Sequence, residues 1–265
     1  MFIIQYNMIR EEQLLMLKNV VNKYPHQYVG VIPFSHEIKS DIPLVGKDFI
    51  PYGSTLLTNL ANELKWSGLY FDLEKFDYGV ALKNRNDMLN DGVMTIQEAQ
   101  VFLNNQSEDS DWFIRPTKDL KQFSGYVTKA GEFLEWSKKA LESDSSIGHK
   151  LTLETEIVVS RPQNIQSEWR WFVIDGKVVD GSMYRFNDKL IKEHIDDLEV
   201  INEAQGFADK WLPNKNCVMD LALVDNKVKV IEFNCINSSG FYNHNVEIIF
   251  DSLWNNFNKE LKCMI

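Results

Sequence analysis

Hydrophobic and polar positions along the chain separate helical segments from strands. Leucines and valines at near-helical spacing between residues 9 and 24 predict a first helix. Apolar runs on either side of Asp175–Gly176 and Asp225–Asn226 predict two β-hairpins, because these dipeptides are typical of two-residue turns. The other predicted helices cover residues 54–64, 86–89, 95–103, 130–143, 198–212 and 245–261, and the other predicted strands cover residues 28–32, 49–52, 68–76, 111–116 and 152–159.

Composition indicates a globular protein. The chain has 265 residues, of which 44% are hydrophobic and 25% charged, enough to bury a large core. Its net charge of −10 and the lack of a basic stripe argue against duplex nucleic acid as a partner. No run approaches eighteen apolar residues, so no membrane segment is expected. The composition leaves the oligomeric state open.

Cysteine usage points to a reducing compartment. The three cysteines are odd in number and lack CxxC spacing, which argues against a disulfide framework and against a zinc site. A cytoplasmic location is therefore expected.

The second predicted hairpin carries the clearest candidate chemistry. Glu232 and Asn234 lie two residues apart and share one strand face, and Asp220 lies on the preceding strand. Two carboxylates facing each other across a ladder repel unless a cation lies between them. Carboxylate and amide oxygens suit magnesium, which also predicts a nucleotide nearby. The alternative is the ordinary polar face of a half-exposed strand.

Basic residues elsewhere could meet the phosphates of such a nucleotide. Arg115 ends a predicted strand, Lys121 follows it, and Ser124–Gly125 form a small loop whose amides could approach oxygen closely. Arg185 ends another predicted strand. Each basic residue could equally be a solvated or salt-bridged surface side chain.

Taken together, these residues resemble the ATP-grasp superfamily of carboxylate–amine or carboxylate–thiol ligases. The stretch "MDLALVDNKVKVIEFN" resembles the family's metal-binding hairpin. The resemblance implies an α+β ATP-grasp fold, in which two α+β subdomains clasp ATP. It also implies two magnesium ions, with Glu232 bridging them and Asp220 and Asn234 each completing one. Residues 105–265 would form this domain, residues 1–104 a small α/β pre-grasp region, and the polar cluster at residues 104–111 the linker.

The stretch "FIRPTKDLKQFSG" resembles the family's phosphate-binding strand and loop. Arg115 stands where the family usually has a lysine, and Lys121 lies downstream, an exchange that resembles a branch found in phages and bacteria. The resemblance gives Arg115, Lys121, Ser124 and Gly125 to the nucleotide phosphates. It leaves open which of the two basic residues takes which position.

The stretch "ETEIVVSRP" resembles the hinge between the two subdomains, near residues 156–162. By resemblance, Glu156 would accept the adenine amino group, and the backbone of Val158 and Val159 would meet the ring nitrogens. Glu168 matches the acid that binds the ribose hydroxyls.

The resemblance implies ATP-dependent ligation of a carboxylate to an amine through an acylphosphate, with a small molecule or peptide as substrate. Arg185 would meet the transferring phosphoryl group, and Arg170 has a supporting or a structural role. Asn237, Ser238 and Ser239 either meet the acceptor substrate or form a polar turn. Two alternatives stay open: an ATP-binding module without catalysis, and a kinase built on the same architecture.

Overall fold

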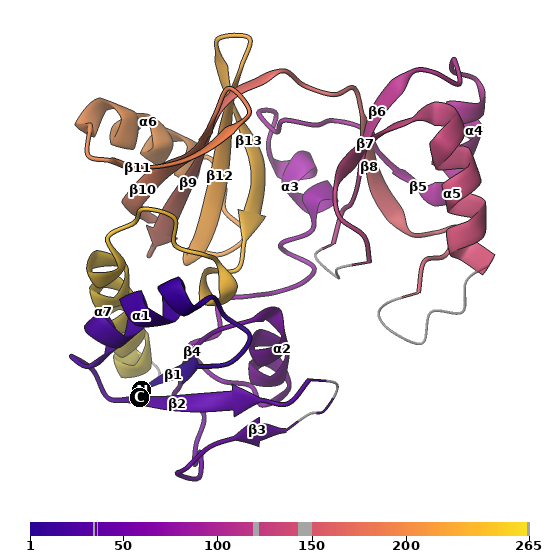
Figure 1. Ribbon diagram of the computed structural model, residues 1–265. Helices are drawn as coiled ribbons and strands as arrows, with labels where there is room; N and C mark the ends of the chain where they lie inside the picture. Colours follow the sequence, from indigo (N-terminus) through magenta and orange to yellow (C-terminus); the bar gives the residue numbers. More distant parts are fainter. Residues whose placement is uncertain (34, 36, 119–121, 143–149, 264–265) are drawn as a thin grey trace. The chain divides into compact units, whose positions relative to one another are not determined.

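A computed structural model describes residues 1–33, 35, 37–118, 122–142 and 150–263 (Figure 1). Within these residues the chain forms two compact units, each built from segments that are distant in sequence. Unit 1 comprises Met1–Phe71, Ser167–Leu221 and Phe233–Ile265, and unit 2 comprises Asp72–Gln166 and Ala222–Glu232.

Unit 1 begins with a small sheet of strand order β3-β2-β1-β4, in which β1 runs parallel to both β2 and β4. Its elements are β1 (Phe2–Gln5), α1 (Glu11–Val21), β2 (His26–Val31), β3 (Ile38–Lys39), β4 (Ile50–Tyr52) and α2 (Thr55–Glu63). Alternate residues of β1 face opposite sides: Phe2 and Ile4 pack with α1, whereas Ile3 packs with α2. This sheet therefore has a hydrophobic core on each face.

The second sheet has the strand order β11-β10-β9-β12-β13. Its elements, with the flanking helices, are β9 (Ile165–Ile174), β10 (Lys177–Phe186), β11 (Lys189–Ile195), α6 (Leu198–Ala208), β12 (Cys217–Val224), β13 (Lys227–Asn234), η1 (Ile236–Ser238) and α7 (Val246–Cys263). Positive φ angles at Asp175–Gly176 and Asp225–Asn226 make both predicted turns type I′, which confirms the two predicted hairpins. The helix α7 lies beside α1 in Figure 1, and its Phe250 shares a core with Phe2 and Phe172.

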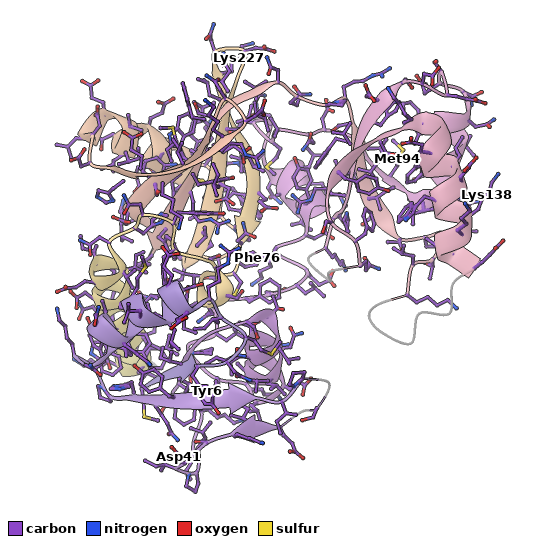
Figure 2. The ribbon with its side chains drawn as sticks, viewed as in Figure 1. Tyr6, Asp41, Phe76, Met94, Lys138 and Lys227 are labelled. Carbon is purple, nitrogen blue, oxygen red and sulfur yellow. The ribbon has the colours of Figure 1, made fainter. Side chains whose placement is uncertain are left out.

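Unit 2 contains a four-stranded sheet of order β5-β8-β6-β7. Its elements are α3 (Tyr78–Asn84), β5 (Val93–Thr95), α4 (Ile96–Asn104), β6 (Asp111–Pro116), β7 (Tyr126–Lys129), α5 (Ala130–Glu142) and β8 (Glu156–Ser160). Helices α4 and α5 cover one face of the sheet, where Phe133 of α5 packs against Trp112 and Ile157. Figure 2 shows Lys138 on the opposite, outward side of α5. This alternation confirms the amphipathic helix predicted at residues 130–143.

Two predicted elements are wrong. Residues 68–76 form no strand, because the Tyr70 N–H donates to the side chain of Asn237 instead of to a neighbouring strand. Residues 86–89 form no helix, since Met88 makes a parallel β-bridge with Val230. The pattern also did not predict β1, β3, α3, β5, β7, β11 or η1. A third type I′ turn, at Asn187–Asp188, joins β10 to β11.

The architecture confirms the predicted α+β class. The predicted boundary between the pre-grasp region and the ATP-grasp domain, at residues 104 and 105, stays a prediction. The two compact units combine segments that are distant in sequence and do not correspond to a single boundary. Among the described helices, none is both long and apolar enough to cross a membrane.

Candidate active site

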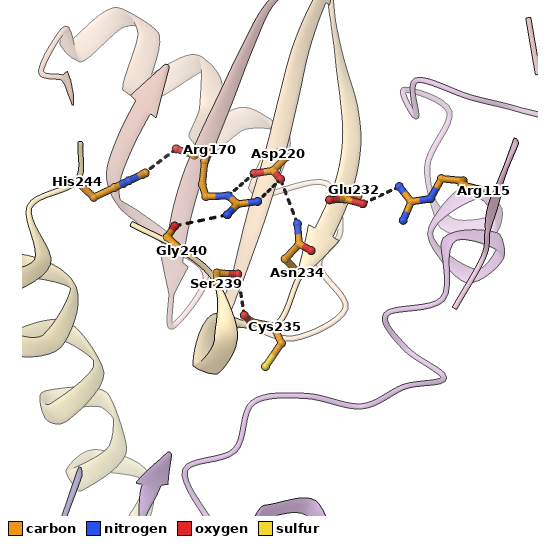
Figure 3. A network of polar contacts seen from close by, with 9 residues as sticks. All are labelled: Arg115, Arg170, Asp220, Glu232, Asn234, Cys235, Ser239, Gly240 and His244. Atoms are coloured by element: carbon orange, nitrogen blue, oxygen red, sulfur yellow. Dashed lines mark hydrogen bonds and ion pairs between the residues drawn. The ribbon is translucent and has the colours of Figure 1, made fainter. Parts of the chain in front are cut away.

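The β12–β13 hairpin positions two of the three predicted metal ligands within unit 1 (Figure 3). Asp220 of β12 accepts a hydrogen bond from Asn234 of β13, with Nδ2 and Oδ2 3.1 Å apart. Arg170 of β9 donates two further bonds to Asp220, Nε to Oδ1 at 2.9 Å and Nη2 to Oδ2 at 2.7 Å. The Asp220 side chain is only 2% exposed, so the guanidinium compensates a buried negative charge.

Aromatic rings surround this ion pair. The Arg170 guanidinium lies 5.1 Å from the ring centroid of Tyr242, which stacks on Tyr184 at 4.8 Å. Burial acts to lower the pKa of Arg170, but the carboxylate of Asp220 raises it, and the net shift is upward. Burial, together with the nearby carboxylates of Asp220 and Glu168, raises the pKa of Tyr184. The arginine therefore stays charged and has little freedom to move.

The third predicted ligand lies in unit 2, where it also meets an arginine. Glu232 of β13 accepts a hydrogen bond from Arg115 of β6, with Oε2 and Nη1 2.6 Å apart. The Arg115 guanidinium lies 5.4 Å from the ring centroid of Tyr78, at the start of α3. Burial raises the pKa of Tyr78 to about 12. Both members of the pair are partly exposed, at 20% for Arg115 and 27% for Glu232, so a ligand could reach them.

A third acid–arginine pair joins two more predicted site residues in unit 1. Glu168 of β9 lies directly opposite Arg185 of β10 in the sheet register. Their side chains form an ion pair, with Oε1 and Nη1 3.1 Å apart. Glu168 is nearly buried, whereas half of the Arg185 side chain is exposed. The arginine therefore keeps a solvent-facing surface for a ligand.

The residues predicted for adenine lie on β8, which is paired along both edges, with β5 and with β6. Val158 and Val159 are buried, and the Val159 N–H donates to the Gly92 carbonyl at 2.7 Å. Glu156 begins the strand and is exposed. Backbone groups of Val158 and Val159, which the resemblance assigns to adenine, thus take part in the pairing of β8 with its neighbours. Their contact with adenine stays a prediction.

The predicted phosphate loop follows β6. Ser124 and Gly125 are exposed between β6 and β7, where amides could approach a ligand. Lys121, predicted to share the phosphate role with Arg115, lies outside the described residues. The division of the phosphate role between the two basic residues stays a prediction.

The predicted ligand set suits magnesium in its donor chemistry. Asp220 and Glu232 offer carboxylate oxygens and Asn234 offers a carboxamide oxygen, all hard donors. In the described part of the chain, no group of three or more His, Cys, Asp or Glu side chains could hold a metal ion. The predicted set has only two carboxylates with an amide, and its role in metal binding stays a prediction.

The loop after β13 has a structural role at two of the three positions considered for the acceptor. Asn237 is 1% exposed, and its Nδ2 donates to the carbonyls of Pro51 and Gly68. The buried Ser239 hydroxyl donates to the Cys235 carbonyl at 2.8 Å. These contacts favour the polar turn over a role in substrate binding for Asn237 and Ser239.

Unit 1 also contains a cavity that the sequence did not predict. It lies between the start of α1, β9, β11 and the loop after η1, and its polar lining residues include Arg10, Glu12 and Lys192. Arg10 and Lys192 are 182 positions apart, and β11 itself was not predicted. No local pattern in the sequence could have joined them.

Comparison with proteins of known structure reveals the same fold in ATP-grasp ligases. A D-alanine–D-alanine ligase from Coxiella burnetii is 12% identical, with a TM-score of 0.62 over 99% of this chain and 97% of that one. A RimK domain ATP-grasp protein from Sphaerobacter thermophilus is 12% identical, with a TM-score of 0.59 over 96% and 99%. The ATP-grasp ligase PsnB, in complex with a minimal precursor, Mg and ADP, is 10% identical, with a TM-score of 0.56 over 97% and 98%.

At these identities the structural comparisons establish the fold alone. A comparison with curated protein sequences finds no match. A family model, the ATP-grasp domain of R-2-K clade family 2, matches residues 93–251, which is more than half of the chain. The predicted ATP-grasp resemblance is thereby confirmed, and the chain belongs to family 2 of the R-2-K clade of ATP-grasp domains.

Proposed function

We propose that this protein is an ATP- and magnesium-dependent ligase that joins a carboxylate to an amine of an amino acid or peptide. The observation that carries the proposal is the set of three predicted acids, each held by an arginine: Asp220 by Arg170, Glu232 by Arg115 and Glu168 by Arg185. The family match and the ligase activity named for the structural neighbours support it.

In the proposed reaction, a carboxylate oxygen of the substrate attacks the γ-phosphorus of ATP. The bond between the γ-phosphorus and the bridging oxygen of ADP breaks, and its electron pair stays on ADP. The substrate carboxylate becomes an acylphosphate. The amine nitrogen then attacks the acyl carbon, phosphate leaves, and the amine proton passes to solvent. Such chemistry depends on positioning and on charge stabilisation rather than on a protein nucleophile.

Charged residues of both units have proposed roles. Arg115, with Lys121 as the second basic residue, binds the nucleotide phosphates, and Arg185 stabilises the transferring phosphoryl group. Oxygens of Asp220, Glu232 and Asn234 would hold magnesium, whose charge neutralises the β and γ oxygens when bound. The remaining proposed nucleotide contacts are Ser124, Gly125, Glu156, Val158, Val159 and Glu168.

Nucleotide binding can be tested separately from chemistry by thermal unfolding with ATP, with and without magnesium. We expect wild type to gain stability from ATP only when magnesium is present, since a ligand bound to the folded state raises its apparent stability. Glu232→Gln should abolish this gain. Asp225→Asn, which removes a charge at the turn of the same hairpin, is the matched control and should keep it.

Chemistry can be tested by trapping with hydroxylamine, which converts an acylphosphate to a hydroxamate without the natural amine. ADP release with hydroxamate formation, followed by an amide product when an amine is supplied, supports the ligase. A stable phosphorylated product instead of an amide would support the kinase alternative. Magnesium-dependent ATP binding without ADP release across a screen of amino acids and peptides would favour the non-catalytic module.

A further inference from the structure

The cavity in unit 1, here called the α1 cavity, has the size and charge of a site for a small anionic molecule. Its volume is about 240 Å³, below the range of roughly 300–1,000 Å³ typical of pockets for drug-sized ligands. Its polar and charged lining residues are Arg10, Glu12, Gln13, Arg170, Lys192 and Tyr242. All of them belong to unit 1.

Positive charge exceeds negative charge along the lining. Arg10, Arg170 and Lys192 are cationic, and Glu12 is the one acid among the lining residues that the structure describes. This balance is opposite to that of the whole chain, whose net charge is −10. A local excess of cations in an acidic protein attracts an anionic ligand to this position.

The cations differ in how firmly they are held. Arg170 is engaged by Asp220, and its Nη1 lies 3.5 Å from the Gly240 carbonyl at the cavity wall. Lys192 makes a looser pair with Glu12, with Nζ and Oε1 3.2 Å apart and side chains 40% and 62% exposed. Exposed pairs of this kind contribute little to stability, so a ligand can replace either partner at little cost.

Two further lining residues, Tyr242 and Gln13, are held in place by contacts with other side chains. Tyr242 lies beneath Arg170 and stacks on Tyr184. Gln13 donates a hydrogen bond to the Tyr52 hydroxyl at 2.7 Å, which holds its side chain in place. A site whose walls are already ordered loses less conformational entropy when it binds a ligand.

We propose that the α1 cavity binds the amino-acid substrate of the ligase, and that its cation excess selects an acidic one, a small α-amino acid or peptide terminus carrying two carboxylates. Arg10 and Lys192 bind the carboxylates, and Glu12, released from Lys192, accepts the ammonium group. This assignment rests on the proposed function, since it names the substrate of that reaction.

Calorimetric titration of the full chain with L-glutamate tests the inference directly. Binding is measured alone and with magnesium and a non-hydrolysable ATP analogue, and compared with L-glutamine and L-lysine. We expect L-glutamate to bind at least about tenfold more tightly than L-glutamine, equivalent to about 1.4 kcal/mol. A dipeptide ending in glutamate distinguishes a peptide terminus from a free amino acid.

Two pairs of variants locate the binding. Arg10→Gln and Lys192→Gln should weaken L-glutamate binding at least about fivefold and reduce its preference over L-glutamine. Lys18→Gln on α1 and Lys189→Gln on β11 remove the same charge from the same elements outside the cavity lining, and should bind as wild type does. Because Arg10 and Lys192 lie at exposed positions, we expect these variants to fold as wild type does, which thermal unfolding checks.

The outcomes separate the inference from the proposed function. If L-glutamine binds as well as L-glutamate, if neither binds, or if the two cavity variants bind as wild type does, the inference is wrong. ADP release with some other carboxylate would then leave the ligase proposal intact. If L-glutamate binds through Arg10 and Lys192 but no substrate gives ADP release, the cavity is an acidic-ligand site and the ligase proposal fails.

Discussion

Arg170 and Asp220 form a bidentate ion pair in unit 1, with both oxygens of a buried carboxylate held by one guanidinium at 2.9 and 2.7 Å. The same carboxylate accepts a bond from Asn234. Because Asp220 is the proposed metal ligand and Arg170 lines the α1 cavity, this pair links the two proposed functions of unit 1. It also makes Arg170 a residue whose loss affects folding.

Replacing Arg170 with methionine should lower the free energy of unfolding by about 3–5 kcal/mol, because it leaves the Asp220 carboxylate buried without a cation. Urea titration measures the loss. Adding Asp220→Asn to Arg170→Met should recover part of it, since the buried charge is removed. Lys189→Met, at an exposed position of β11, is the control. An unchanged urea midpoint in Arg170→Met, or no recovery in the double variant, would contradict this account.

Arg115 provides a test of the proposed phosphate site in unit 2. Its pair with Glu232 is partly exposed, so Arg115→Met should cost only about 1 kcal/mol of stability. Affinity for magnesium and a non-hydrolysable ATP analogue should nevertheless fall more than about tenfold, because a charge-assisted contact is lost. Calorimetric titration measures this affinity. Lys118→Met, which removes a cation paired with Glu74, is the control. Wild-type affinity in Arg115→Met would transfer the phosphate role to Lys121.

Elements whose signals are local could be predicted from the sequence. The hairpins at Asp175–Gly176 and Asp225–Asn226 combine strand periodicity with residues that tolerate positive φ, and both formed as expected. The amphipathic helix α5 begins at the predicted residue, and it is helical over all of the predicted range that the structure describes, Ala130–Glu142. Asp220 and Glu232 were proposed as site residues for the same reason, since the hairpin brings them onto adjacent strands, and their role in the site stays a prediction.

Features that depend on distant parts of the chain could not be predicted. The apolar run at residues 68–76 predicts a strand. In the structure, however, the Tyr70 N–H donates to the side chain of Asn237, 167 positions away. The arginine partners of Asp220 and Glu232 lie 50 and 117 positions from them. The α1 cavity depends on β11, whose turn at Asn187–Asp188 lacks the glycine of the commonest hairpin signals.

Asp180 should make the protein less stable as the pH rises from about 4 to 6. Burial raises its pKa to about 6, although the Asn245 N–H and His194 act in the opposite direction. In that interval the folded state binds more protons than the unfolded state, so the free energy of unfolding falls with pH. Asp180→Asn should remove most of this pH dependence of the free energy of unfolding between about pH 4 and 6. Asp188→Asn, in an exposed turn, should leave it unchanged. Urea titrations at several pH values measure it, and parallel profiles for wild type and Asp180→Asn would contradict the assignment.

His244 should change the pH dependence of stability in the opposite direction, so that the protein is less stable at lower pH. Burial lowers its pKa to about 4, and its Nε2 lies 3.1 Å from the Arg170 carbonyl. Between about pH 6.5 and 4 the unfolded state takes up a proton that the folded state does not, so stability is lost as the pH falls. His244→Gln, which keeps a donor for the carbonyl, should weaken this loss. His26→Gln is the control, at a half-buried position near the surface. A loss as steep in His244→Gln as in wild type would exclude His244 as its source.

Asn237 joins three segments of unit 1. Its Nδ2 donates to the carbonyls of Pro51 and Gly68, at 2.8 and 2.9 Å, and its Oδ1 accepts from the Tyr70 N–H at 2.9 Å. Its backbone carbonyl accepts from the Gly53 N–H. Each of these groups is buried with its bond made inside the protein, so the side chain has a structural role that only an amide can perform.

Asn237→Asp should therefore be strongly destabilising despite its identical shape. The two carbonyls lose their donors and face a carboxylate, and each buried polar group left without a partner costs about 1–3 kcal/mol, so we expect a loss of at least about 3 kcal/mol. Asn258→Asp is the matched control, because among the described residues the Asn258 side chain donates one hydrogen bond, to the Trp254 carbonyl within α7. Urea titration compares the two. If Asn237→Asp unfolds at the wild-type midpoint, the side chain does not hold these segments together. The alternative from the sequence, that Asn237 contacts the acceptor substrate, would then be favoured.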